Sequence, residues 1–268
     1  MIRIIKGRRR PVILVMILLL TGVFLQAQNP FRLASQNCLH LGWGDSGYQN
    51  NKNQILQYLF DNYDVIMLQE VMAQANLGAV TPGNHYYRIS AVKGVGSYKE
   101  AYGFIISQNI IATSVYDYSG AGFARPPSGV LLQTGNNWTW GVNYHAIFGK
   151  VKAARQDEVR LISNVYQSFQ TTMVNGSCYN RVIFGGDWNL AANEIQQQLG
   201  LNVQPTAKTS LKSNGGLSQP YDHFVWDANV ITVTNVQVIN IQTLLNLNNL
   251  QWRQDVSDHL GISCDVHY

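Results

Sequence analysis

Hydrophobic positions along the chain repeat with two different periods. Residues Phe31 to Asn37 alternate between apolar and polar side chains, which predicts a strand with one buried face. The stretch Asp64 to Gln69, "DVIMLQ", contains a continuous apolar run instead, which is typical of a strand buried on both faces. Between them, Gln54 to Phe60 places its apolar residues on one side of a helix.

The same two patterns continue to the end of the chain. They predict helices at 155–172 and 190–199, and strands at 85–91, 102–107, 129–134, 140–148, 181–186, 223–227, 230–239 and 260–267. Many strands with a few interposed helices predict an α/β fold. We expect a four-layered sandwich in which two mixed β-sheets pack face to face and the helices lie outside.

Polar residues stand at the ends of several predicted strands: Asn37, Glu70, His145, Asp187, Asn189, Asp222, Asp258 and His259. In "RVIFGGDWN" (181–189) an apolar run ends in a carboxylate and an amide two residues apart. Because Asp and Asn are common turn formers, a turn explains this stretch, taken alone, better than a site does. Side chains from several strand ends converge when the strands share a sheet edge, which favours a site there.

The first 27 residues differ from the rest of the chain. Five Lys and Arg residues precede an apolar run from Pro11 to Leu25, and a small residue follows at Ala27. This order predicts a secretory signal peptide over 1–27 and a secreted or periplasmic protein. A membrane anchor is the alternative, but a span needs about 20 apolar residues. We expect cleavage near Ala27, no membrane anchor after it, and a single domain over 28–268.

Removing this segment changes the charge and leaves all three cysteines in place. Residues 28–268 carry 14 Lys and Arg against 15 Asp and Glu, so the basic whole-chain balance does not indicate nucleic-acid binding. Any contact with a polyanion then needs a local basic patch. Cys38, Cys178 and Cys264 are an odd number in an exported chain, and their spacing matches no zinc motif.

Six short motifs resemble one known superfamily. They are "NYDVIMLQEV", "SYKEAY", "NYHA", "GGDWN", "YDHF" and "SDHLGI". Their order and approximate spacing are those of the endonuclease/exonuclease/phosphatase superfamily, and "SYKEAY" is similar to the secreted deoxyribonuclease I branch. The resemblance covers residues 31–267. It implies the deoxyribonuclease I-like sandwich and hydrolysis of a phosphodiester bond.

The resemblance also implies a role for each strand-end residue. His145 and His259 supply the general base and general acid, with Glu100 partnering His145 and Asp222 partnering His259. The phosphate and the metal-bound water are positioned by Asp187 and Asn189. The metal site is formed by Glu70, Asn37 and Asp258, where hard oxygen ligands suit Mg²⁺ or Mn²⁺, with Ca²⁺ as an activating or structural ion.

Three further residues are expected to contact the substrate. In the resemblance, Arg125 meets the phosphate backbone, Tyr98 stacks on a sugar in the minor groove, and Asn143 assists. The first two assignments have a purely structural alternative: an ordinary exposed arginine and a packed tyrosine. Likewise, Glu100 read alone is a surface charge and His145 a core histidine.

The chain also departs from the family pattern. Met72, His223 and Gly261 replace an arginine, an arginine and a proline that are usual at these positions. The deoxyribonuclease I loop disulfide is absent from the cysteine pattern. Cys38 and Cys264 fall on the first and last strands, which are neighbours in this fold, so a bridge between them and two buried thiols both stay open.

The expected function is that of a secreted, divalent-metal-dependent endonuclease that cuts DNA with little sequence preference and leaves 5′-phosphate ends. The alternatives on the same scaffold are the nuclease subunit of a cytolethal distending toxin, a sphingomyelinase or an inositol-phosphate phosphodiesterase. A catalytically inactive binding module is a further alternative, although all the site residues are present. We expect a monomer with DNA as its substrate, and toxin-type partner subunits stay open.

Overall fold

The computed structural model describes residues 30–44, 46–72, 75–94 and 99–268. The predicted signal peptide, and the cleavage near Ala27, lie outside these residues. Within the described part of the chain, no helix is long and apolar enough to cross a membrane.

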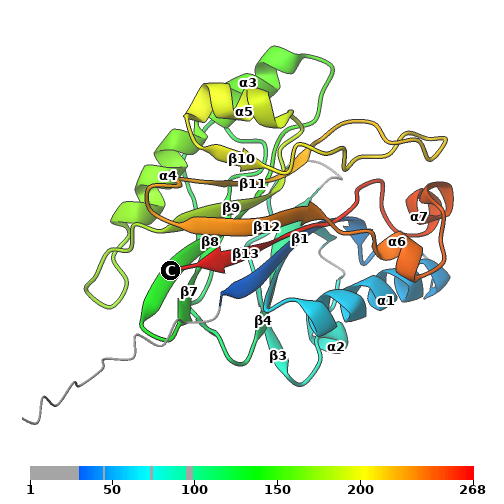
Figure 1. Cartoon of the computed structure of the whole chain (residues 1–268), viewed down its shortest axis with the longest axis horizontal. Coiled ribbons are helices and arrows are strands. Elements are labelled where there is room, and N and C mark those ends of the chain that lie inside the picture. Colours follow the sequence, from blue (N-terminus) through cyan, green and yellow to red (C-terminus); the bar gives the residue numbers. More distant parts are fainter. Residues whose placement is uncertain (1–29, 45, 73–74, 95–98) are drawn as a thin grey trace, which may run out of the picture.

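Two β-sheets form the centre of the molecule (Figure 1). The first has the strand order β12 (Thr232–Val238), β13 (Ile262–His267), β1 (Phe31–Leu41), β2 (Val65–Met72), β4 (Glu100–Ser107) and β3 (His85–Ile89). The second has the order β10 (Asn202–Gln204), β11 (Asp222–Trp226), β9 (Val182–Asp187), β8 (Asn137–His145), β7 (Ser128–Thr134) and β5 (Ile111–Ala112), with β6 (Tyr116–Asp117) paired to β7. Both sheets are mixed, since β1 runs parallel to β2 and β8 runs parallel to β9.

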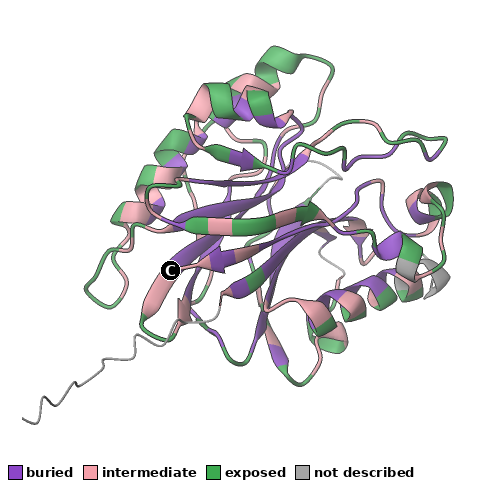
Figure 2. Ribbon diagram, in the orientation of Figure 1, coloured by how far each residue is buried: buried purple, intermediate pink, exposed green. Residues whose placement is uncertain are grey.

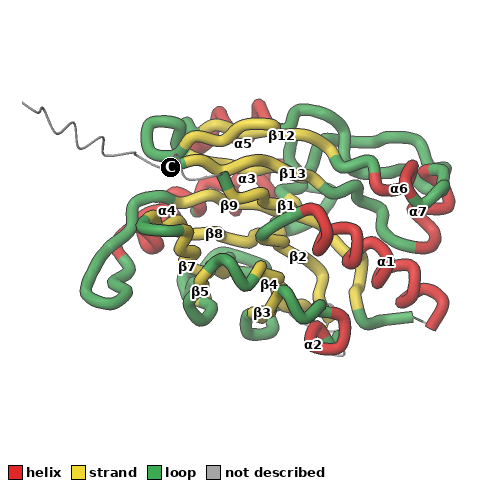
Figure 3. The backbone as a smooth tube through the Cα atoms, turned by 60° about the horizontal axis from the view of Figure 1, so that its bottom comes forward, coloured by secondary structure: helices red, strands yellow, loops and turns green. Residues whose placement is uncertain are grey.

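The helices cover the two outer faces, so the molecule has four layers (Figure 3). One face carries α1 (Ser46–Asn62), α2 (Leu77–Val80), α6 (Ile241–Leu244) and α7 (Asn249–Asp255). The other carries α3 (Lys152–Arg160), α4 (Ile162–Thr171) and α5 (Ala192–Leu199). The predicted fold class, two mixed sheets packed face to face with helices outside, is confirmed.

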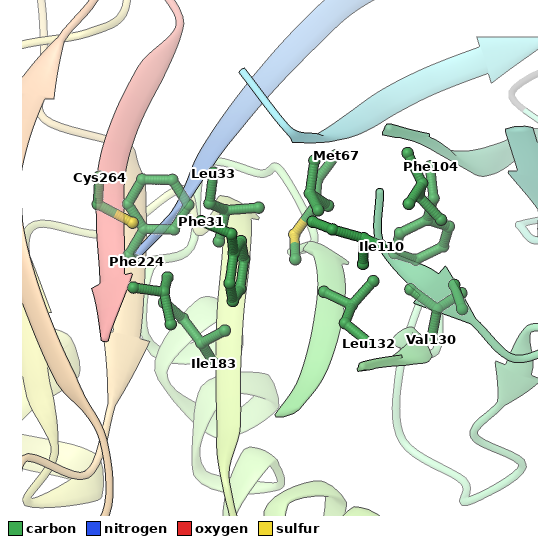
Figure 4. Close-up of a cluster of buried hydrophobic side chains, with 14 of the residues drawn as sticks. Phe31, Leu33, Met67, Phe104, Ile110, Val130, Leu132, Ile183, Phe224 and Cys264 are labelled. Carbon is green, nitrogen blue, oxygen red and sulfur yellow. The ribbon is translucent and has the colours of Figure 1, made fainter. Parts of the chain in front are cut away.

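Three hydrophobic clusters hold these layers together. The central one lies between the sheets and contains Met67 and Phe104 from the first sheet and Leu132, Ile183 and Phe224 from the second (Figure 4). The other two lie between each sheet and its helices. Burial is therefore highest along the strands and falls toward the helix surfaces and the edge strand β12 (Figure 2).

The predicted strands all form, and the differences concern short elements. The expected helix over 155–172 is interrupted at Leu161, where the backbone N–H bonds Glu158 O, and becomes α3 and α4. The elements that were not predicted are α2, α6, α7, β5, β6 and β10, which are two to seven residues long. Such lengths are too short for a hydrophobic period to show.

Cys38 and Cys264 do not form a disulfide bond. Cys38 packs in the cluster under α1, and Cys264 packs in the cluster between the sheets, so the two side chains lie on opposite faces of one sheet. In β1 the residue opposite Cys264 is Leu33. All three cysteines are free, and both buried ones are apolar core residues.

Glycine at position 186 is required by the close approach of β8. Gly186 has φ +148°, and a Cβ added there would lie 1.8 Å from Tyr144 O. We expect Gly186→Ala to lower the free energy of unfolding by at least about 2 kcal/mol, measured by urea denaturation. Gly149→Ala is the control, since nothing lies within 4 Å of its Cβ. Equal stability of the two variants would contradict this packing.

Candidate active site

The sheet topology brings the predicted strand-end residues to one edge. Because β1 and β2 are parallel, as are β8 and β9, their carboxyl ends lie at the same end of each sheet. His145 and Asp187 are direct neighbours there. The antiparallel strands β4 and β11 begin at this end, with Glu100 and Asp222 as their first residues. His259 comes three residues before β13.

The first histidine pair joins the ends of β8 and β4. His145 Nδ1 lies 2.7 Å from Glu100 Oε1, and both side chains are 6% exposed. The carboxylate holds the proton on Nδ1 and leaves Nε2 facing the interior of the site. Burial lowers the pKa of His145, but the Glu100 and Asp187 carboxylates together outweigh it, so this pKa lies above its ordinary value.

The second histidine–carboxylate pair, His259 with Asp222, has the same geometry. His259 Nδ1 lies 2.7 Å from Asp222 Oδ2, and both residues are buried. Burial again lowers the pKa of His259, and the Asp222 and Asp187 carboxylates together raise it well above its ordinary value. The structure therefore contains two imidazoles, each fixed through Nδ1 by a buried carboxylate.

Asp187 lies between the two pairs. Its Oδ2 is 3.5 Å from Nε2 of His145 and 3.5 Å from Nε2 of His259. The other oxygen, Oδ1, accepts the backbone N–H of Asn189, which has φ +50° and whose amide donates to Ala146 O. Burial and the neighbouring Asp222 carboxylate raise the pKa of Asp187.

Glu70 approaches this group from β2. Its backbone has φ +57° at a register break, which turns the carboxylate toward the site. Glu70 Oε1 lies 4.0 Å from His145 Nε2 and accepts a hydrogen bond of 3.1 Å from Asn37 Nδ2. The same Asn37 nitrogen donates to Asp187 Oδ2 at 3.2 Å. An amide thus links the two carboxylates across the sheets.

These side chains fit a divalent cation. Two groups each place three ligand atoms within 4.8 Å of one another: Glu70, Glu100 and His145, and Asp187, Asp222 and His259. A cluster of carboxylate oxygens is the donor set that Mg²⁺ and Mn²⁺ prefer. Asn37 lies where the metal site was predicted, but its Oδ1 accepts the Leu39 N–H and its nitrogen faces the carboxylates.

The remaining predicted residues lie at the rim or beyond it. Asp258 is partly exposed, with Oδ2 3.2 Å from Arg253 Nη1 and Oδ1 4.0 Å from His259 Nε2. Arg125 donates from Nε to His145 O and lies 3.7 Å from Glu100 Oε1, so it braces the first pair. Its phosphate contact stays a prediction. Tyr98 lies outside the described residues.

Asn143 lies in the core behind the site, and its predicted contact with substrate stays a prediction. The residue is fully buried, its amide nitrogen donates to Leu68 O and Gly103 O, and its oxygen accepts from Gln69. Asn143 therefore connects β8 to the opposite sheet, and all its polar atoms are used within the protein.

No protein-family profile and no curated protein sequence matches the chain. Solved structures do match. TDP2 from D. rerio, complexed with a single-strand DNA product, aligns with a TM-score of 0.62 at 16% identity over 89% of this chain and 99% of that one. The human Nocturnin catalytic domain with a bound sulfate anion aligns with a TM-score of 0.61 at 16% identity, over 88% of this chain and 94% of that one. A Leptotrichia buccalis endonuclease/exonuclease/phosphatase family protein aligns with a TM-score of 0.61 at 16% identity, over 89% of this chain and 100% of that one.

The chain has the endonuclease/exonuclease/phosphatase fold. This likeness establishes the arrangement of the strands, whereas the role of each residue depends on the geometry above. Within this fold, three residues that the sequence did not single out hold the site in place: Lys52, Glu158 and Thr209.

Lys52 is a buried cation under the first loop of the site. It lies on α1, is 3% exposed, and donates from Nζ to Cys38 O and Leu39 O, just beyond Asn37. Burial lowers its pKa to about 8. The only sequence signal was its place on a helix of uncharged neighbours, which does not reveal burial.

Glu158 and Thr209 each support one histidine pair. The buried Glu158 carboxylate accepts from Tyr144 OH, Ile147 N and Ala124 N, so it fixes the chain on both sides of His145. Thr209 supports the other pair: its hydroxyl accepts the backbone N–H groups of Tyr221 and Asp222, and its carbonyl accepts from Leu260 N.

Lys52→Met is expected to destabilise the fold because two buried carbonyls lose their donor. We expect a loss of about 1–3 kcal/mol in the free energy of unfolding, measured by urea denaturation. Lys152→Met is the matched control, because Lys152 is 57% exposed and pairs only at the surface with Glu194. If both variants lose the same stability, Lys52 does not hold the loop as described.

Asp222→Asn is expected to lower the pKa of His259 in the metal-free protein. The wild-type pKa lies well above 6.5, so protonated His259 stabilises the fold below pH 6.5, and this stabilisation is lost as pH rises through the folded-state pKa. Nitrogen NMR titration of the imidazole measures both values. An unchanged pKa in the variant would show that Asp222 does not partner His259.

Proposed function

We propose that the protein is a secreted, divalent-metal-dependent endonuclease that hydrolyses phosphodiester bonds of DNA. The observation that carries this proposal is the paired arrangement of His145 and His259. Each imidazole is held through Nδ1 by a carboxylate, and each presents Nε2 at 3.5 Å from one oxygen of Asp187. Two oriented proton-transfer groups then face one small space beside Glu70.

Hydrolysis of a phosphodiester needs two proton transfers on opposite sides of the phosphorus. One imidazole takes the proton of the attacking water, and the other gives a proton to the departing oxygen. The hydrogen bonds from Nδ1 to the carboxylates keep both rings in the tautomer whose Nε2 can take part in proton transfer. In this proposal Asn189 and Arg125 orient the phosphate.

The acidic side chains account for the proposed metal dependence. Glu70 and Asp187 would hold the cation, with Asn37 keeping their carboxylates in place and Asp258 close to His259. A bound Mg²⁺ or Mn²⁺ would supply positive charge to the phosphate oxygens. Ca²⁺ as an activating or structural ion belongs to the same proposal.

DNA is the proposed substrate on two grounds. The "SYKEAY" motif resembles the secreted deoxyribonuclease I branch, and a structure of similar fold, D. rerio TDP2, is described in a complex with a single-strand DNA product. Cleavage that leaves 5′-phosphate ends follows from the same resemblance. The proposal of secretion rests on the sequence of residues 1–27. We propose that the protein is a monomer that is secreted or acts in the periplasm.

Nicking of supercoiled plasmid tests the proposal. The protein is expected to nick DNA with Mg²⁺ or Mn²⁺ and to be inactive with a chelator. We expect His145→Ala to lower the cleavage rate by about 10²–10⁴-fold, because one proton-transfer group is lost. The His267→Ala variant is the control, since this histidine contacts Thr234 on the surface, away from the site.

An intact plasmid under every metal condition, with a folded protein, would contradict DNA as the substrate. Sphingomyelin and inositol phosphates are then the next substrates to assay. Metal-dependent hydrolysis of one of these that disappears in His145→Ala would keep the chemistry and change the target. No hydrolysis of any phosphodiester would favour the binding module.

A further inference from the structure

The strands β1 and β2 break their register at the same place. Asn37 pairs with Gln69 and Leu41 pairs with Val71, so residues 38–40 of β1 lie opposite Glu70 alone. The two extra residues on β1 form a double bulge directly beside the carboxylate. A bulge of this kind redirects side chains at the edge of a sheet.

The backbone in this bulge is unusual for its residues. Leu39 has φ +43° and His40 has φ +60°, and Glu70 opposite them has φ +57°. Non-glycine residues rarely adopt this left-handed conformation, and such outliers concentrate at functional sites. Lys52 stabilises this conformation, because its Nζ donates hydrogen bonds to Cys38 O and Leu39 O.

The result is a third histidine at the site. His40 Nε2 lies 3.3 Å from Glu70 Oε2, and the His40 backbone N–H donates to the same oxygen at 3.1 Å. Its ring packs on Trp43 with the ring centroids 4.8 Å apart, which fixes the plane of the imidazole. Because the other Glu70 oxygen faces His145, the carboxylate lies between two imidazoles.

The spacing of these atoms suits shared coordination. Two ligands at adjacent positions around one small divalent cation are about 3 Å apart. The 3.3 Å between His40 Nε2 and Glu70 Oε2 is close to that value. Imidazole nitrogen binds Mn²⁺, Co²⁺ and Zn²⁺ better than Mg²⁺, which prefers an all-oxygen set.

We propose that His40 is a metal ligand together with Glu70, and that it makes the site prefer Mn²⁺ to Mg²⁺. This inference rests on the metal dependence of the proposed function and goes beyond it, since a site of carboxylates and amides alone would favour neither ion strongly. The alternative role for His40 is to hold the Glu70 carboxylate by a hydrogen bond without touching the ion.

Mn²⁺ binding measured by EPR separates these roles. In His40→Gln we expect the Mn²⁺ dissociation constant to rise about 10–100-fold. The Mg²⁺ constant, from competition against Mn²⁺, should change by less than about threefold. Pulsed EPR of bound Mn²⁺ should show imidazole nitrogen couplings in the wild type that are lost or reduced in His40→Gln. His267→Gln should match the wild type, and thermal melting without metal checks that each variant folds.

Three outcomes would overturn the inference. Equal losses of Mn²⁺ and Mg²⁺ affinity would show that His40 only orients Glu70. Nitrogen couplings that persist in His40→Gln and vanish in His145→Gln would assign the ligand to His145. A wild type that binds neither ion would remove the metal dependence of the proposed function as well, whereas the first two outcomes leave that function intact.

Discussion

The face-to-face contact of the two sheets is the constraint on which the site depends. Asp187 Oδ2, at the end of β9, lies 3.2 Å from Asn37 Nδ2 on β1, and it is 3.5 Å from Nε2 of both His145 and His259. Hydrogen bonds of this length are lost with a shift of about 1 Å. The hydrophobic cluster between the sheets, from Met67 to Phe224, therefore sets the geometry of the polar atoms at its edge.

Irregular backbone occurs at the places where polar side chains turn into the site. Glu70 and Asn189 have left-handed φ values, and Gly186 gives β9 its close approach to Tyr144. Near these residues the chain is held by hydrogen bonds to buried polar side chains such as Glu158 and Thr209. The strained residues are held by satisfied hydrogen bonds behind them, which is how a conformation of higher energy persists in a folded protein.

The sequence predicted the strands well because buried strands carry long apolar runs, and it predicted the site because polar residues end those runs. It did not predict the contacts that depend on how deep a residue lies in the sheet. Asn143 shares a face of β8 with His145 but lies two residues deeper, and its amide bonds the opposite sheet. His40 was missed because its position depends on a bulge, and Lys52 because its burial under that bulge depends on tertiary packing, and no hydrophobic period reveals either.

The charge of the site links the histidines to the cation. The Glu100 and Asp187 carboxylates raise the pKa of His145, and the Asp222 and Asp187 carboxylates raise the pKa of His259, so both rings hold a proton more tightly than an ordinary histidine does. A general base must be neutral near its working pH. Beside a divalent cation the pKa of both imidazoles would fall, because like charges disfavour protonation. In the proposed function, this lowering would suit the imidazole that acts as general base, and the buried carboxylates would help the general acid to keep its proton.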